Sequence, residues 1–292
     1  MFKGVFTALV TPFTRQGEVD EAALRCLVDQ QIEAGIDGLV AVGSTGEGPT
    51  VTHTENLRIV EIVIEQARRR VPVIAGTGSN STIEAIEMTK RAAKLGASAS
   101  LQVAPYYNKP NQEGFYLHFA EIAKSVDLPI ILYNIPGRTG KNMETETTLR
   151  LATIKNIVGI KEASGNLGQV MDIIAGAPSN FTVLSGDDNW TLPMMAMGAS
   201  GVISVVTHLA APDMVAMCKA ISAGNQTEAK RLHFKLLPLC KALNVDQNPI
   251  PIKYALSRLG MIEEVYRLPL CPLSTALKTN VDAVLKDYGL LR

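Results

Sequence analysis

The sequence has few of the side chains from which metal and redox sites are usually built. Its four histidines show no HxxxH or HExxH spacing, and its four cysteines lie far apart with no CxxC pair. A zinc site is therefore not expected, and the cysteines are predicted to be reduced thiols rather than a disulfide framework. We expect neither a metal nor a cofactor.

An excess of charge of one sign and long apolar runs are also missing. The formal net charge is +0, 19% of residues are charged, and the longest basic run is Arg68-Arg69-Arg70, which argues against nucleic acid as a partner. No apolar run approaches the ~20 residues that cross a bilayer. The first residues lack a charged-then-apolar leader, so we expect a cytoplasmic protein with no membrane partner.

What the sequence does contain is a repeat of short apolar strands and amphipathic helices. Eight strand-then-helix units follow one another, and the last is a strand over 201–206 with a helix over 212–223. This pattern is typical of an α/β fold of the (β/α)8 TIM-barrel type. A doubly wound open sheet is the competing layout, but the segment 76–81 lacks the last glycine of GxGxxG and no GxxxxGK[ST] exists.

The character of the chain changes after residue 224. Strand signals disappear, and helical periodicity indicates helices over 227–244, 252–259 and 275–288, separated by prolines. We therefore divide the chain into a barrel domain over 1–224 and a C-terminal helical segment over 225–292.

Lys161 follows an apolar, β-branched run and lies at the C-terminal end of the sixth predicted strand. Lysine is rarely buried because removing an ammonium from water is costly. One interpretation is a nucleophilic amine, which an apolar barrel interior would keep neutral part of the time. The other is an ion pair with Glu162 or a lysine at the rim facing solvent. Since neighbouring strand residues point to opposite faces, Glu162 is poorly placed as its partner.

Other polar residues fall at the ends of predicted strands, where barrel enzymes carry their active sites. Ser44 and Thr45 follow the second strand, Tyr107 follows the fourth, Tyr133 lies on the fifth, and Arg138 comes just after the fifth. Each also has a plain structural explanation as a turn residue, a core tyrosine or a surface arginine. Because all of these residues are expected at the same mouth of the barrel as Lys161, the functional interpretation is favoured.

These residue types suit amine catalysis on a keto acid. Lys161 would add to the ketone and lose water, giving an imine that acidifies the neighbouring C–H. Tyr133 would carry the protons, with Ser44 and Tyr107 as a relay. Thr45 and the glycine-rich turn would hold one carboxylate, and the fork of Arg138 a second one. The scarcity of histidine disfavours a metal-dependent aldolase.

Five segments in order resemble the dihydrodipicolinate synthase/N-acetylneuraminate lyase family. They are GLVAVGSTGE (38–47), PYYNKP (105–110), YNIPGRTG (133–140), GIKEASG (159–165) and NPIPIK (248–253). The resemblance extends from Gly4 to near the C-terminus and implies a Schiff-base enzyme on a barrel.

The resemblance points to the synthase branch, which condenses pyruvate with L-aspartate-4-semialdehyde in lysine and diaminopimelate biosynthesis. It implies that Ile203 lines the pyruvate site through its backbone. It also implies a homodimer or homotetramer in which Tyr107 reaches in from a neighbouring subunit. Arg138 distinguishes the chain from lyases acting on sialic acid, whereas Ser44 replaces the threonine of many synthases.

The resemblance further suggests an allosteric site for lysine, built by residues matching His53, Asn80, Glu84 and Tyr106. All four are of suitable type, with Glu84 facing the ammonium and Asn80 and Tyr106 the carboxylate. Asn56 stands where a second histidine is often seen.

Two other functions remain open from the sequence. One is a lyase of the same family that releases pyruvate from a longer 2-keto acid. The other is a barrel without catalysis that only binds a ligand, which the presence of Lys161, Tyr133 and Arg138 argues against.

Overall fold

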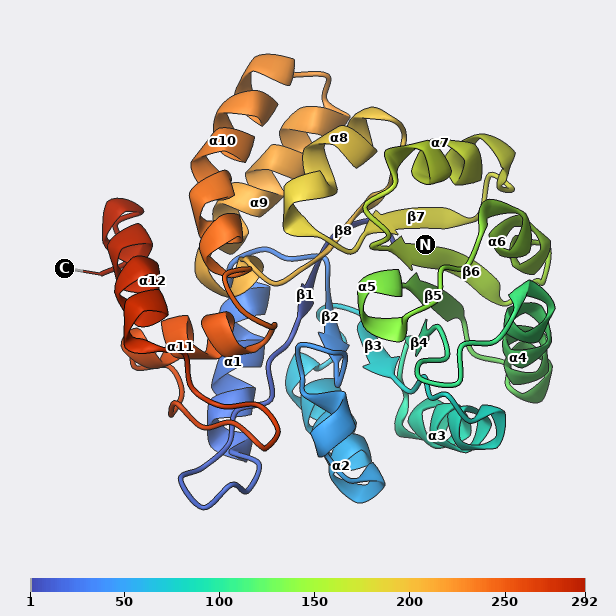
Figure 1. Ribbon diagram of the computed structural model, residues 1–292, viewed down its shortest axis with the longest axis horizontal. Coiled ribbons are helices and arrows are strands. Elements are labelled where there is room, and N and C mark those ends of the chain that lie inside the picture. Colours follow the sequence, from blue (N-terminus) through green and yellow to red (C-terminus); the bar gives the residue numbers. More distant parts are fainter. Residues whose placement is uncertain (1, 292) are drawn as a thin grey trace.

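The computed structural model describes residues 2–291, and its centre is a closed barrel of eight parallel strands in sequence order (Figure 1). The predicted (β/α)8 barrel is therefore confirmed. Each strand is short and its side chains are almost all buried, as expected for strands covered on both faces. The strands are β1 (Gly4–Ala8), β2 (Gly38–Ala41), β3 (Val73–Gly76), β4 (Ala99–Val103), β5 (Ile130–Asn134), β6 (Ile157–Glu162), β7 (Thr182–Ser185) and β8 (Gly201–Ser204).

Helices surround the strands on the outside of the barrel (Figure 1). They begin at sequence signals such as the capping box of Thr52 and Glu55 at the start of α2. The helices between and after the strands are α1 (Glu21–Glu33), α2 (His53–Ala67), α3 (Thr82–Leu95), α4 (Gln112–Ser125), α5 (Pro136–Thr139), α6 (Thr145–Ala152), α7 (Leu167–Gly176), α8 (Thr191–Ala196) and α9 (Thr207–Ser222). Short 3₁₀ turns lie at η1 (Gly48–Thr50) and η2 (Asp188–Trp190).

Two sequence predictions of local structure were wrong. No helix was expected directly after the fifth strand, but the short helix α5 begins there at Pro136; the fixed φ of proline suits the first helical position. The last strand ends at Ser204 rather than at 206, and α9 begins at Thr207 rather than at 212. Pro212 had marked the predicted start, but it lies inside α9 just after a kink at Ala210.

The register of the strands places the site residues side by side. Tyr133 on β5 is paired with Lys161 on β6. Ile203 on β8 is paired with Phe6 on β1, where the barrel closes. Tyr133 and Ile203 belong to one buried apolar cluster together with Leu184 of β7. The barrel interior is thus packed with side chains, and in barrels of this type ligands bind at the C-terminal mouth.

The C-terminal segment forms α10 (Gln226–Ala242), α11 (Ile250–Arg258) and α12 (Thr275–Asp287). In Figure 1 these helices lie beside α1 and α9. Buried side chains of α10 and α12, such as Leu232 and Val281, belong to the same apolar cluster as Leu24 and Val28 of α1. The apolar core runs continuously across residue 224, so the division into two domains stays a prediction.

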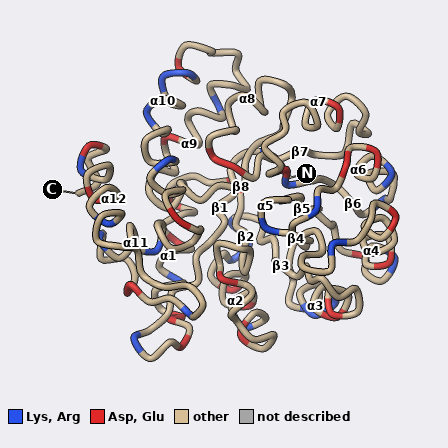
Figure 2. Tube along the Cα trace, in the orientation of Figure 1, with Lys and Arg blue, Asp and Glu red and all other residues tan. Residues whose placement is uncertain are grey.

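The surface carries both signs of charge. Figure 2 shows basic and acidic positions interspersed over the outer helices. Among residues 2–291, no helix is both long and apolar enough to cross a membrane.

Candidate active site

A cavity of about 540 Å³ opens at the C-terminal ends of the first strands of the barrel. Ser44, Tyr133 and Arg138 line it, as predicted from their positions after β2 and β5. The C-terminal segment also contributes to its wall, through Asn248 and Leu270. The cavity is therefore built jointly by the barrel loops and the C-terminal segment.

Lys161 lies inside the barrel beside this cavity. Its side chain is only 6% exposed, and its Nζ lies 4.2 Å from the centre of the Tyr133 ring. A cation over an aromatic face is attracted by the ring. The pairing of β5 with β6 brings the amine and the phenol together, which is the arrangement that the sequence predicted for an amine and its proton carrier.

Glu162 points to the other face of β6, toward α7, as the alternation of strand side chains predicts. Its carboxylate accepts hydrogen bonds from the Ser164 backbone N–H at 2.7 Å, from Asn134 Nδ2 at 3.1 Å and from Gln169 Nε2 at 3.4 Å. Burial raises the pKa of this carboxyl above its usual range, although the three donors lower it. Glu162 is thus occupied by a network of its own.

Gly186, just after β7, makes room for the lysine. A Cβ at this position would lie 3.1 Å from both Cγ and Cε of Lys161 and 2.8 Å from the Cβ of Ala163. The next residue is Asp187, whose pKa burial raises while the neighbouring charge of Lys161 lowers it. Neither residue was assigned a role from the sequence, and for Gly186 the reason is that a missing side chain leaves no chemical signal.

The turn after β2 has an unusual backbone. Val42 adopts a left-handed conformation with φ of 54°, which is rare for a β-branched residue. The neighbouring strand permits it through Gly76, where a Cβ would lie 2.1 Å from the Val42 carbonyl oxygen. Strain of this kind persists where surrounding structure enforces it, commonly at functional sites. The turn carries Ser44 and Thr45 two and three residues after Val42.

Asn248 connects the two residues that were predicted to bind carboxylates. Its Nδ2 donates to Thr45 Oγ1 at 2.9 Å, and its backbone carbonyl accepts from Arg138 Nη2 at 2.9 Å. Thr45 is buried and Arg138 is exposed at the rim. The segment containing Asn248 had been recognised only as part of the family resemblance, and its role as a bridge could not be predicted.

Tyr107 does not join the other site residues within one chain. Its side chain is 89% exposed, and its backbone is left-handed with φ of 68°. The sequence placed it at the mouth of the barrel, but the β4–α4 loop directs it into solvent. Its participation in catalysis stays a prediction that requires a neighbouring subunit.

Three residues of the predicted lysine site, His53, Glu84 and Tyr106, line the same cavity, and the fourth, Asn80, is hydrogen-bonded to Tyr106. His53 Nε2 lies 2.5 Å from Glu84 Oε1, and Asn80 Nδ2 donates to the Tyr106 carbonyl oxygen at 3.1 Å. The Oδ1 of Asn56, in the same lining, is buried with no hydrogen-bond partner in the structure.

Within the part of the chain that the structure describes, no three or more histidine, cysteine, aspartate or glutamate side chains are grouped so that they could hold a metal ion.

Comparison with known proteins matches residues 1–288 to the Dihydrodipicolinate synthetase family. The chain belongs to this family. A relative from Syntrophus aciditrophicus named 4-hydroxy-tetrahydrodipicolinate synthase is 52% identical over 291 residues, covering 100% of both chains.

Solved structures of the family superpose closely on this chain. The chloride-inhibited dihydrodipicolinate synthase of Acinetobacter baumannii, complexed with pyruvate, has a TM-score of 0.98, 44% identity and 100% coverage of both chains. The enzyme of Cyanidioschyzon merolae with lysine bound has a TM-score of 0.97, 44% identity and 99% coverage of both chains. The family resemblance predicted from the sequence is thus confirmed over the whole chain.

Proposed function

We propose that this chain catalyses the condensation of pyruvate with L-aspartate-4-semialdehyde to give 4-hydroxy-tetrahydrodipicolinate, a reaction of lysine and diaminopimelate biosynthesis. The observation that carries the proposal is the position of the buried Lys161 amine over the ring of Tyr133. Both residues lie on a barrel that belongs to the Dihydrodipicolinate synthetase family. Full-length relatives at about 50% identity bear the name of this synthase, which favours it over the lyase alternative and over a barrel without catalysis.

The proposed chemistry begins with attack of Lys161 Nζ on the ketone carbon of pyruvate. The resulting carbinolamine loses water and becomes an imine. Removal of a methyl proton then gives an enamine, whose carbon attacks the aldehyde of the second substrate. Tyr133 is the proposed proton carrier, because its ring adjoins the amine and its position at the cavity gives access to the substrate. Ser44, on the cavity wall, would extend the proton relay.

Carboxylate binding is assigned to the residues joined by Asn248. Thr45 would hold the carboxylate of pyruvate deep in the site, and Arg138 that of the semialdehyde at the rim. Ile203, on the strand that closes the barrel, would contribute backbone contacts to pyruvate.

Borohydride reduction in the presence of pyruvate tests the proposal. Reduction of the imine fixes the three-carbon unit to the enzyme, and mass spectrometry should locate it on Lys161. A Lys161→Arg variant is the control and should give no adduct. An adduct on another lysine, such as Lys155, would contradict the mechanism. In a coupled assay with the semialdehyde, Arg138→Ala should reduce kcat/KM by roughly 100-fold or more, since a carboxylate loses its charged partner.

We also propose that the enzyme works as a homodimer or homotetramer in which Tyr107 enters the site of a neighbouring subunit. The support is a large aromatic side chain held in solvent by a left-handed backbone, close to the exposed Tyr106. Sedimentation should show at least a dimer, and Tyr107→Phe should lower kcat while preserving assembly. A fully active monomer would refute this proposal.

A third proposal is that lysine binds at His53, Asn80, Glu84 and Tyr106. The grouping of these residues along one cavity supports it, and a family member has been solved with lysine bound. Titration of activity with L-lysine tests the proposal, and an absence of inhibition at millimolar concentrations would reject it.

A further inference from the structure

A buried ion pair joins the C-terminal segment to the turn after β2. Lys253 Nζ on α11 lies 2.5 Å from Glu47 Oε1, and both side chains are fully inaccessible to solvent. Burial lowers the pKa of Lys253, and the facing carboxylate partly restores it. Removing two charges from water costs so much free energy that such a pair adds little net stability. Its location in the molecule therefore calls for a role other than stability alone.

Glu47 lies within the turn that carries Ser44 and Thr45. Its backbone is left-handed, with φ of 55° and ψ of 36°, and its N–H donates to the Ser44 carbonyl oxygen at 3.1 Å. The second carboxylate oxygen of Glu47 accepts from the Arg267 backbone N–H at 3.3 Å. A displacement of the Glu47 side chain would therefore be transmitted to Ser44 and Thr45.

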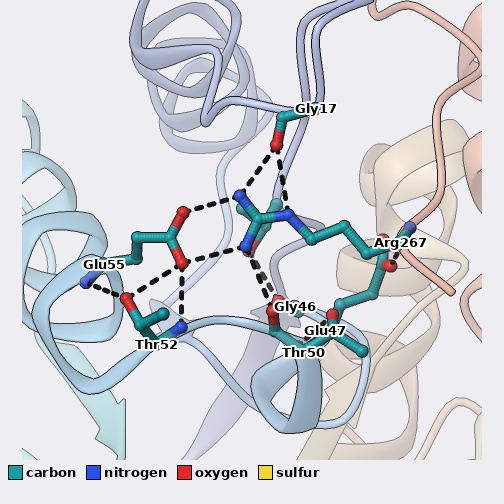
Figure 3. Close-up of polar contacts among 8 residues, drawn as sticks. Gly17, Gly46, Glu47, Thr50, Thr52, Glu55 and Arg267 are labelled. Atoms are coloured by element: carbon teal, nitrogen blue, oxygen red, sulfur yellow. Dashed lines mark hydrogen bonds and ion pairs between the residues drawn. The ribbon is translucent and has the colours of Figure 1, made fainter.

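Arg267 fixes the outer side of the same turn (Figure 3). Its guanidinium bonds both oxygens of Glu55, at 2.6 and 2.9 Å, and donates to the carbonyl oxygens of Gly17 at 2.8 Å and Thr50 at 3.1 Å. The Lys253 ammonium and the Arg267 guanidinium both lie over the ring of Phe13, at 4.2 and 4.3 Å from its centre. The C-terminal segment thus contacts the turn through two cationic side chains, those of Lys253 and Arg267.

The same segment also reaches Thr45 directly, through the hydrogen bond from Asn248. The turn is consequently fixed at Thr45 by Asn248 and at Glu47 by Lys253. Without the ion pair, the turn would keep the hydrogen bonds from Asn248 to Thr45 and from Thr11 Oγ1 to the Gly46 carbonyl oxygen, but the charged link from Glu47 to α11 would be lost.

We propose that Glu47 and Lys253 are positioning residues that hold the turn after β2 so that Thr45 meets the carboxylate of pyruvate. They touch neither substrate nor the reacting atoms. This inference rests on the proposed function and adds that the C-terminal segment determines the affinity for pyruvate.

The test uses Glu47→Gln, Lys253→Met and the double variant in the full-length protein. Each single variant leaves one buried group without its partner, so each should lose about 5–10 °C of Tm. The double variant removes both charges and should recover most of that loss. The pyruvate concentration for half-maximal borohydride trapping at Lys161 should nevertheless stay about tenfold higher than in the wild type, corresponding to about 1.4 kcal/mol of lost binding.

Two further measurements distinguish positioning from a general loss of structure. The KM for the semialdehyde should change less than about twofold in the double variant, because Arg138 binds that substrate outside the turn. Lys235→Met is the matched control, since it removes another lysine of the C-terminal segment, one that is paired with Asp213 of α9 rather than with the turn. It should leave the pyruvate dependence of trapping unchanged.

The outcomes separate this inference from the proposed function. If the wild type gave no adduct at Lys161, the proposed function would fail. If the wild type were trapped and the double variant had the same half-saturation for pyruvate, the positioning role would be refuted. Should the double variant not fold, Glu47→Asp, which keeps both charges but shortens the reach, serves for the same measurement. A wild-type half-saturation in that variant would again refute the role.

Discussion

At the scale of single residues, the site depends on how the methylene chain of Lys161 is held. The amine lies over Tyr133, while Cγ and Cε pass beside the backbone of Gly186. The space for this path exists only because position 186 has no side chain. The amine that we propose attacks pyruvate is therefore positioned by a neighbour that has no side chain.

Gly186→Ala should impair catalysis without preventing folding. The new methyl group would lie 2.8 Å from Ala163 Cβ, which cannot rotate away, and 3.1 Å from two atoms of Lys161. The lysine chain would have to move, and a displacement of about 1 Å can cost up to 100-fold in rate. We expect kcat/KM to fall roughly 10- to 100-fold, with slower borohydride trapping by pyruvate.

Gly137→Ala is the matched control for this variant. Gly137 lies in α5 beside Arg138, and a Cβ there would meet no atom within 4 Å. Its trapping rate should equal that of the wild type. A wild-type trapping rate in Gly186→Ala as well would show that the lysine does not need this space.

The sequence could predict residues with reactive side chains, but not the residues that only position those side chains. Lys161 and Tyr133 stood out as polar groups at the ends of buried strands, and the structure brings them together. Gly186 and Asn248 gave no such signal. Asn248 meets Thr45 across 203 positions of sequence, and no local pattern encodes a contact of that range.

At the scale of elements, hydrophobic periodicity predicted the helices whose bounds depend on the local sequence. The helix expected over 252–259 begins two residues after the start of α11 and ends one residue after its end, because its periodicity is a property of the local chain. The helix expected over 275–288 likewise differs from α12 by one residue. The short helix α5 was missed because a single turn has no periodicity to detect.

The conformation of the loops at the mouth of the barrel could not be predicted from the sequence, because it depends on distant contacts. The turn after β2 obtains its shape from α11 and from Arg267, which lie more than two hundred positions away. Its left-handed residues, Val42 and Glu47, are types that do not favour that conformation by themselves. Tertiary contacts therefore decide the conformation of the element that was predicted to bind the carboxylate.

At the scale of the whole molecule, the barrel is closed by the pairing of β1 with β8 and by one buried histidine. His208 Nε2 accepts from the Val10 N–H at 3.2 Å, and Nδ1 lies 2.9 Å from the carbonyl oxygen of Val205. The ring thus links the residues that follow the two closing strands. This arrangement requires a neutral imidazole, because a proton on Nε2 would face another N–H donor.

The stability contributed by His208 should disappear in acid. Burial lowers its pKa to about 4, from about 6.5 in an unfolded chain. Between these values the unfolded chain binds a proton that the folded protein does not, so folding weakens as the pH falls. For this one group the loss is about 3 kcal/mol between pH 6.5 and pH 4.

A comparison of the wild type with His208→Gln isolates this effect. Other groups also titrate: burial lowers the pKa of His118 to about 4, and the raised pKa of Glu162 acts in the opposite direction. These contributions are common to both proteins and cancel in the difference.

Glutamine at position 208 keeps a polar side chain there but cannot be protonated in this pH range. The wild type should be the more stable protein near neutrality, and its advantage should narrow by about 3 kcal/mol by pH 4. Urea unfolding at fixed protein concentration measures the free energy of unfolding of both proteins as a function of pH. A difference between the two proteins that stayed constant with pH would show that the pKa of His208 is not lowered by folding.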